Sequence, residues 1–293
     1  MLGHLFFAVK HILGRDVPGS EFSYVRVFPD DTFIVSYPKS GNTWVRFLIA
    51  NLLNPDQPVT MTDMEQIVPH CEAQSRRFFR LMPRPRIIKC HRSFDPRFKR
   101  VIYVLRDPRD VVVSQYYFQK KGKRLDDSYP IQHFVARFMA GETSPYGTWS
   151  ENVTSWLALR QNDPAFLLLH YERMLADPVR ELARIAKFLG LNASQETLVR
   201  AVQRSSADEM RKLESLQSDQ WAQTKGTRKD IPFIRSARSG GWKSALPKEC
   251  VAEMEAAWGP LMNRLGYEMS TPEQSDAGRP TAEKLSKLHV VAG

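Results

Sequence analysis

Cysteine is scarce in this chain. Its 293 residues include three cysteines, Cys71, Cys90 and Cys250. They lie far apart and lack the paired spacing of a structural metal site, so the sequence predicts neither a disulfide framework nor a metal-ligand cluster. Free thiols are typical of a reducing compartment, and we therefore expect a cytoplasmic protein.

Long apolar runs are also lacking. No stretch approaches the roughly 20 apolar residues that a membrane-spanning helix needs. Residues 1–10 hold a short apolar stretch without a charged leader or a clear cleavage site, so they make a poor signal peptide. We expect a docking helix or a weak membrane-surface contact there, within an irregular N-terminal segment of residues 1–30. Residues 270–293, rich in small and polar side chains, are predicted to form a flexible tail.

Acidic residues are fewer than basic ones. The chain has 42 Lys and Arg residues against 32 Asp and Glu residues, a net charge of +10. This balance favours anionic partners such as nucleotides, nucleic acid, acidic sugars or membrane surfaces, although some soluble proteins are simply basic. Because no internal repeat and no convincing linker is visible, one large α/β domain over residues 31–269 is preferred to two small ones.

Short apolar strands alternate with amphipathic helices along the chain. Strands are predicted at residues 33–35, 87–88, 101–105 and 165–170, and helices at 45–53, 108–118, 131–140, 149–159, 179–189, 195–202, 208–216 and 247–265. This alternation predicts a central parallel sheet flanked by helices. The polar carboxyl ends of the strands then meet at one edge of the sheet. That edge would gather Lys39, Ser40, Thr43, Lys89, His91, Arg106, Ser114 and Tyr171.

The turn after the first strand reads Tyr37-Pro38-Lys39-Ser40-Gly41-Asn42-Thr43-Trp44. Its proline ends the strand, its glycine allows a sharp bend, and a helix follows. Amides at the start of that helix, the lysine ammonium and the two hydroxyls would together form an anion site. The alternative is an ordinary strand–turn–helix corner. The nucleotide-triphosphate loop G-x-x-x-x-G-K-[ST] is absent, because here the lysine precedes the only glycine.

Three other segments carry candidate site residues. Lys89 and His91 lie just past the second strand, although a lone histidine is more often a structural hydrogen-bonding group. Arg106 at a strand end and Ser114 two turns into the next helix suit a phosphate monoester; an Arg106–Asp110 ion pair is the alternative. The long segment 218–243 is either a lid over a bound anion or a solvated basic loop. Its cations are Lys225, Arg228, Lys229, Arg235, Arg238 and Lys243.

Four of these segments together resemble a known family. The stretch from Tyr37 to Trp44 resembles the 5′-phosphosulfate loop of sulfotransferases that use 3′-phosphoadenosine 5′-phosphosulfate (PAPS), and Val104 to Ser114 resembles their 3′-phosphate motif. Tyr171-Glu172 and the stretch from Arg235 to Lys243 are similar to two further family motifs, in the family's order. The resemblance covers roughly residues 30–265 and implies a single α/β domain with a P-loop-like phosphosulfate-binding loop.

The sequence departs from the family pattern at several positions. Asn42 stands where threonine is usual, and Ser236, Ala237 and Gly241 replace lysine, glycine and aspartate of the C-terminal signature. The family's dimerisation signature cannot be recognised in this sequence, because Pro247 and Lys248 occupy two of its positions. The oligomeric state therefore stays open.

The resemblance also implies roles for individual residues. Lys39 and residues 40–43 would hold the 5′-phosphate, Arg106, Ser114 and Arg235 the 3′-phosphate, and Trp44 and Tyr171 the adenine. The full set implied to bind the donor is Lys39, Ser40, Gly41, Asn42, Thr43, Trp44, Arg106, Ser114, Tyr171, Met210, Arg235, Arg238, Ser239 and Gly240. His91 would take the acceptor's proton, with Lys39 and Lys89 as the other catalytic residues.

The reaction implied is in-line sulfuryl transfer from PAPS to a hydroxyl, or less favourably an amine, with 3′-phosphoadenosine 5′-phosphate (PAP) as product. Positioning and charge stabilisation do most of the work in such a transfer, and it needs no metal. A small or lipid-like acceptor is favoured over a long sugar chain, because several residues could line an apolar pocket, although most of them could equally be core. They are Phe78, Phe79, Leu81, Met82, Phe94, Phe134, Phe138, Tyr146 and Trp149.

Two other functions remain open at this point. A phosphate-loop kinase would use Lys39 as its loop lysine and Asp107 as a magnesium ligand, against which the position of the lysine argues. A non-catalytic binder of polyanions or nucleic acid would explain the positive charge. No nucleic-acid-binding signature is present, so we expect no nucleic-acid partner.

Overall fold

A computed structural model describes residues 25–270 of the chain, so the expected N-terminal helix and nearly all of the expected tail lie outside the described residues. The chain divides into two compact units, residues 1–247 and residues 248–293. The first holds the sheet and the site described below, and the second holds α13 (Lys248–Arg264). Among residues 25–270, no helix combines the length and apolarity that crossing a membrane requires.

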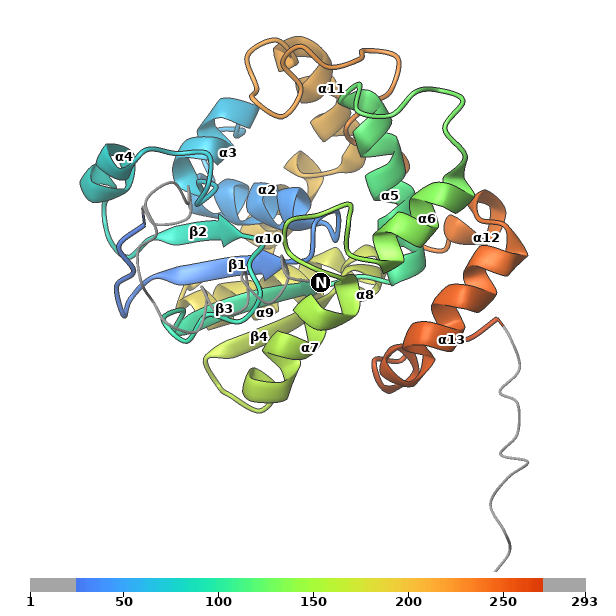
Figure 1. The fold of residues 1–293 in the computed structure, drawn as a ribbon. Coiled ribbons are helices and arrows are strands. Elements are labelled where there is room, and N and C mark those ends of the chain that lie inside the picture. Colours follow the sequence, from blue (N-terminus) through green and yellow to red (C-terminus); the bar gives the residue numbers. More distant parts are fainter. Residues whose placement is uncertain (1–24, 271–293) are drawn as a thin grey trace, which may run out of the picture. The chain divides into compact units, whose positions relative to one another are not determined.

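Four parallel strands form the sheet of the first unit, in the order β2-β1-β3-β4 (Figure 1). The strands are β1 (Thr32–Ser36), β2 (Ile87–Cys90), β3 (Arg100–Leu105) and β4 (Phe166–His170). The register pairs Val35 with Cys90 on one side of β1 and with Tyr103 on the other, so the strands end almost level. The predicted fold class, a parallel sheet flanked by helices in an α/β domain, is confirmed.

Helices cover both faces of this sheet. The helices of the first unit are α2 (Asn42–Leu53), α3 (Met61–Ile67), α4 (Arg76–Leu81), α5 (Pro108–Lys121), α6 (Ile131–Met139), α7 (Trp149–Arg160), α8 (Tyr171–Ala176), α9 (Pro178–Leu189), α10 (Gln195–Arg204), α11 (Ala207–Gln217) and α12 (Trp242–Ala245). Tyr171 thus begins a helix and does not extend the fourth strand.

Successive side chains of each strand point to opposite faces of the sheet, so each strand contributes to the packing on both faces. Ile34 and Ile102 pack on α2, α9 and α10 in one buried apolar cluster. On the other face, Trp156 of α7 lies over Tyr103 and Phe166, with ring centroids 6.2 and 6.3 Å apart. Figure 1 shows α7 in front of the sheet and α9 and α10 behind it. With both faces covered, the carboxyl edge is left for a ligand.

The corner between β1 and α2 has a strained backbone. Lys39 has φ 71° and Gly41, the N-cap of α2, has φ 101°. Asn42 fixes the corner to β1, because its side-chain amide donates to the Ile34 carbonyl and to Ser36 Oγ, both at 3.2 Å. Gly41 faces the ring of Tyr171, where a Cβ atom would lie 2.5 Å from Cδ2. Only glycine can adopt this positive φ without strain and also leave room for the Tyr171 ring.

Replacing Gly41 with alanine should therefore destabilise the protein. The alanine side chain would strain the left-handed backbone at this position and would also collide with the Tyr171 ring. We therefore expect the free energy of unfolding to fall by about 2–4 kcal/mol. Denaturant titration would measure this loss. Gly190→Ala is the matched control: Gly190 also has positive φ, 75°, but a Cβ there meets nothing within 4 Å. Its expected cost is the backbone strain alone, about 1–2 kcal/mol. Equal losses in the two variants would contradict the close approach to Tyr171.

Candidate functional site

A cavity of about 520 Å³ opens at the carboxyl edge of the sheet. Residues from the ends of β1, β2 and β3 line it, together with residues of α2, α5, α8 and α11 and of the segment before α12. Of the predicted site residues, the cavity is lined by Lys39, Gly41, Asn42, Thr43, Trp44, Lys89, His91, Arg106, Ser114, Tyr171, Met210 and Arg235. The other four, Ser40, Arg238, Ser239 and Gly240, lie outside the lining.

Ser40 nevertheless suits an anion site. Its hydroxyl is buried and has no hydrogen-bond partner within the described residues, and the same holds for Asn42 Oδ1. A buried hydroxyl without a partner costs free energy unless a ligand satisfies it. The loop therefore carries an unused donor at the N-terminus of α2, where the helix dipole favours negative charge.

The Lys39 side chain lies between two aromatic rings. Its Nζ is 4.2 Å from the ring centroid of Phe118 and 4.2 Å from that of Phe233. Burial is the largest cause that lowers the Lys39 pKa to about 7, and the charges of Lys89 and Arg106 lower it further. A phosphate in the cavity would reverse this shift, because it would pair with a cation that the charge of Glu214 compensates only in part.

Arg106 connects the loop to the distal C-terminal motif. Its Nη1 donates to the Lys39 carbonyl at 3.2 Å and its Nη2 to the Arg238 carbonyl at 2.9 Å. The guanidinium lies 4.2 Å from the centroid of the Tyr171 ring, and its buried Nε has no partner within the described part of the chain. The planar guanidinium is thus held in place, and its Nε–H remains able to donate to an anion.

Asp110 fixes the position of the Gly240–Trp242 segment. Its carboxylate accepts from the Gly240 amide at 2.7 Å and from the Trp242 amide at 3.1 Å. These contacts replace the Arg106–Asp110 hydrogen-bonded pair that was the alternative interpretation of the motif. Burial raises the pKa of the carboxyl group above its ordinary value. Asp110 therefore acts on the site through the backbone of residues 240–242.

Segment 218–241 has two kinds of cation. Arg228 forms ion pairs with Asp127 and Asp230, and Lys229 pairs with Asp219, all outside the cavity lining. Arg235 does line the cavity and lies 4.4 Å from the centroid of the Tyr117 ring. The predicted lid thus turns one of its cations inward and binds others to surface carboxylates.

His91 is held in the tautomer that a general base requires. Its Nδ1 lies 2.7 Å from the Ser36 carbonyl, to which it can only donate, so Nε2 carries the lone pair. Burial first, and then the charge of Lys89, hold the His91 pKa well below its ordinary value. The backbone is fixed as well, because Asn152 Nδ2 donates to the His91 carbonyl at 3.1 Å. A neutral imidazole at this position can accept a proton from a hydroxyl.

Lys89 is the second buried lysine of the site, with 6% of its surface exposed. Burial lowers its pKa to about 8, and the charge of Arg46 adds to the effect. The guanidinium of Arg46 is itself paired with Glu65 at 2.8 Å. Lys89 is therefore still largely a cation at neutral pH, and it can stabilise negative charge beside His91.

Several residues that line the cavity were not identified from the sequence. Lys121 is buried, donates to the carbonyls of Arg228 and Ile231, and pairs with Glu214 at 3.2 Å. In the sequence it is one of a run of cations, and nothing there shows which of them faces inward. His70 lies beside His91, with its ring centroid 5.7 Å from that of His91. A loop residue such as His70 leaves no periodic signal.

Most of the residues considered as walls of an apolar pocket lie outside the cavity lining. Tyr146 is the only member of that set among the described residues that line the cavity. Phe79, Phe134, Phe138 and Trp149 are buried side chains outside the lining. Apolar character alone does not separate a pocket wall from a core position. The aromatic walls come instead from Phe118 and Phe233 beside Lys39.

Comparisons with known proteins agree on one family. The sulfotransferase-domain family model matches residues 29–266. Sulfotransferase 1E1 of Bos taurus is 33% identical over 232 residues, covering 74% of this chain and 78% of that protein. Sulfotransferase 1A1 of Canis lupus familiaris is 31% identical over 266 residues, covering 83% and 87%.

A solved structure shares the fold. The crystal structure of retinol dehydratase in complex with retinol and PAP matches with a TM-score of 0.68 and 20% identity, covering 86% of each chain. The family resemblance inferred from the four sequence motifs is thereby confirmed. The chain belongs to the sulfotransferase family and is a sulfotransferase.

Proposed function

We propose that this sulfotransferase transfers the sulfuryl group of PAPS to a hydroxyl group of a small or lipid-like acceptor. The observation that carries the proposal is the meeting of two groups of anion-binding residues in one cavity. Lys39 and its loop form one group, and Arg106, Ser114 and Arg235 form the other. Two separated phosphate groups on one nucleotide require such a pair of sites. PAP bound to retinol dehydratase, which shares the fold, is consistent with it.

The chain's residues divide the transfer between them. His91 Nε2 takes the proton of the acceptor hydroxyl, whose oxygen forms the new bond to sulfur. The bond from sulfur to the bridging phosphate oxygen breaks, and its electron pair leaves with PAP. Lys39 and the unpartnered Ser40 hydroxyl stabilise that departing phosphate, while Lys89 stabilises the sulfuryl oxygens. His91 is thus the base, and the two lysines carry the electrostatic part of catalysis.

The charge of the cavity bears on the acceptor. Lys39, Lys89, Arg46 and Lys121 all line it, and they repel an ammonium group. A neutral hydroxyl acceptor is therefore favoured over an amine. Retinol, bound in the retinol dehydratase structure, is an apolar alcohol, and this supports a lipid-like acceptor here.

The kinase alternative is disfavoured by the contacts of Asp107. Its carboxylate caps α5 through the Arg109 amide at 2.9 Å and also accepts from the Arg109 guanidinium at 2.7 Å. A carboxylate engaged in this way is not available to hold magnesium. A cytoplasmic location and a reaction without a metal stay predictions.

The assignment of Arg106 to the 3′-phosphate predicts a specific loss in affinity. Arg106→Ala should weaken PAP binding about 10- to 100-fold, because charge-assisted hydrogen bonds to the phosphate are lost. Isothermal titration would measure the affinity for PAP and for adenosine 5′-phosphate, which lacks the 3′-phosphate. The preference for PAP should largely disappear in the variant, while binding of the control nucleotide should change little. If the variant kept the wild-type preference for PAP over adenosine 5′-phosphate, the assignment of Arg106 to the 3′-phosphate would be wrong.

The base role of His91 predicts a loss in turnover without a loss in donor binding. With radiolabelled PAPS and a panel of phenols, sterols and long-chain alcohols, the wild type should label at least one hydroxyl acceptor. His91→Asn should do so about 10²–10⁴-fold more slowly, the usual contribution of a general base, with wild-type affinity for PAP. Because the His91 pKa is depressed in the free protein, wild-type kcat/KM for PAPS should not fall between about pH 7 and pH 6. If His91→Asn kept full activity, a residue other than His91 would have to be the base.

The lowered pKa of Lys39 predicts a pH-dependent affinity for PAP. In the free protein Lys39 loses its proton as the pH rises through about 7, and the bound phosphate requires the cation. Binding at about pH 8 should therefore take up a proton, seen as a dependence of the titration heat on the ionisation enthalpy of the buffer. Lys39→Arg keeps the charge at every pH, so proton uptake should decrease. Equal uptake in both proteins would show that Lys39 is not the titrating group.

A further inference from the structure

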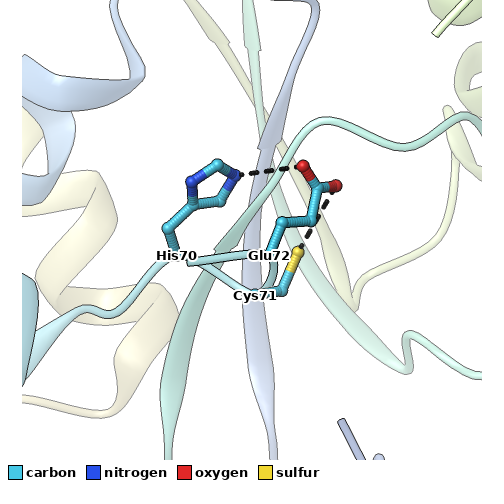
Figure 2. A group of neighbouring side chains, drawn as sticks. All are labelled: His70, Cys71 and Glu72. Atoms are coloured by element: carbon cyan, nitrogen blue, oxygen red, sulfur yellow. Dashed lines mark hydrogen bonds and ion pairs between the residues drawn. The ribbon is translucent and has the colours of Figure 1, made fainter. Parts of the chain in front are cut away.

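Three consecutive residues between α3 and α4 bring metal-ligating atoms together at the His91 end of the cavity. The ligand atoms of His70, Cys71 and Glu72 all lie within 4.8 Å of one another. His70 Nε2 is 3.5 Å from Glu72 Oε2, and Cys71 Sγ is 3.9 Å from Glu72 Oε1. Figure 2 shows the imidazole and the thiol each joined by a dashed line to a different oxygen of the Glu72 carboxylate. The scattered cysteine spacing in the sequence did not predict this cluster.

These separations suit a small tetrahedral ion. Zinc binds histidine nitrogen and carboxylate oxygen at about 2.0–2.2 Å and thiolate sulfur at about 2.3 Å, so its ligand atoms lie roughly 3.3–3.8 Å from one another. In the cluster, the His70–Glu72 and Cys71–Glu72 ligand atoms are 3.5 and 3.9 Å apart. Small side-chain rotations would therefore bring all three ligands into range.

Backbone hydrogen bonds to β2 fix the position of the cluster. His70 forms a parallel bridge with Lys89 of β2, closed by hydrogen bonds from the Lys89 amide to the Pro69 carbonyl at 2.8 Å and from the Cys71 amide to the Lys89 carbonyl at 2.9 Å. The Tyr146 hydroxyl donates to Glu72 and orients its carboxylate. Such support around the ligands is what metal sites usually require.

The ligand chemistry also fits. His70 Nε2 is buried without a hydrogen-bond partner within the described residues. Metal binding displaces a proton from the Cys71 thiol, and the thiolate and Glu72 together then balance the charge of a divalent ion.

We propose that His70, Cys71 and Glu72 bind a zinc-like divalent cation, whose fourth position is taken by water. Of the three ligands His70 lines the cavity, and its ring lies 5.7 Å from the ring of His91, so the ion would lie close to the acceptor side of the site. It therefore inhibits the enzyme by obstructing the acceptor and not the donor. The inhibition rests on the proposed function, whereas the binding does not.

The binding test uses the full chain, freed of metal and kept reduced. Zinc is titrated against a chromophoric chelator, and cobalt is added separately as a spectroscopic probe. We expect one equivalent of each ion to bind, with a thiolate-to-cobalt charge-transfer band and intense tetrahedral ligand-field bands. Zinc affinity should rise with pH, because Cys71 must lose its proton.

Variants identify the ligands. Cys71→Ser should abolish the charge-transfer band and weaken zinc binding at least about tenfold; His70→Gln and Glu72→Gln should weaken it similarly but keep the band. Cys250→Ser is the matched control, since this cysteine is outside the cluster, and it should bind as the wild type does. Glu72→Gln keeps the test decisive if Cys71→Ser does not fold. Less than one equivalent bound, or the same affinity in wild type, Cys71→Ser and Glu72→Gln, would overturn the site.

Activity assays separate this proposal from the proposed function. In the presence of zinc, the apparent KM for the acceptor should rise while the affinity for PAP stays constant, and Cys71→Ser should be insensitive. Inhibition that competes with PAP would refute the placement of the ion beside His91. Loss of the proposed function would remove the assay, but the cobalt spectrum would still decide whether the metal binds.

Discussion

Buried positive charge without matching negative charge is the constraint on which this structure depends. Lys39, Lys89 and Arg106 converge at the carboxyl edge of the sheet, and burial and mutual repulsion lower the pKa of both lysines. Aromatic faces and backbone carbonyls compensate only in part. Burying cations is costly, so a fold that gathers them is selected for a ligand that neutralises them. A nucleotide with two phosphate groups meets that requirement.

The rest of the fold serves to hold these cations in fixed positions. Parallel strands of nearly equal register bring the β1, β2 and β3 ends level, so the lysine of the loop, the histidine and the arginine face one space. Longer connections are fixed through backbone groups: Arg106 binds the Arg238 carbonyl, and Asp110 binds the Gly240 amide. Fixed donors need no reorganisation during the reaction, which is the main source of electrostatic catalysis.

The sequence was sufficient wherever a local pattern determines the structure. Apolar strands, the glycine at the corner before α2 and the order of the motifs predicted the sheet, the loop and the family. It was insufficient where burial depends on distant parts of the chain. In the sequence, buried Lys121 is indistinguishable from exposed Lys123, and Phe134 and Phe138 are core side chains rather than pocket walls. Arg238 contributes a carbonyl to Arg106, and a backbone role is invisible in residue identity.

The same charges that depress the lysine pKa values also act on His91, and this couples donor binding to base strength. Lys89 and Lys39 both lower the His91 pKa, so in the free protein the imidazole is neutral but a weak base. An anionic donor screens those cations. It therefore raises the pKa of His91 while it keeps Lys39 protonated. In the proposed mechanism, His91 becomes a stronger base when the sulfuryl group is in place, so one electrostatic arrangement both binds the donor and prepares the acceptor's deprotonation.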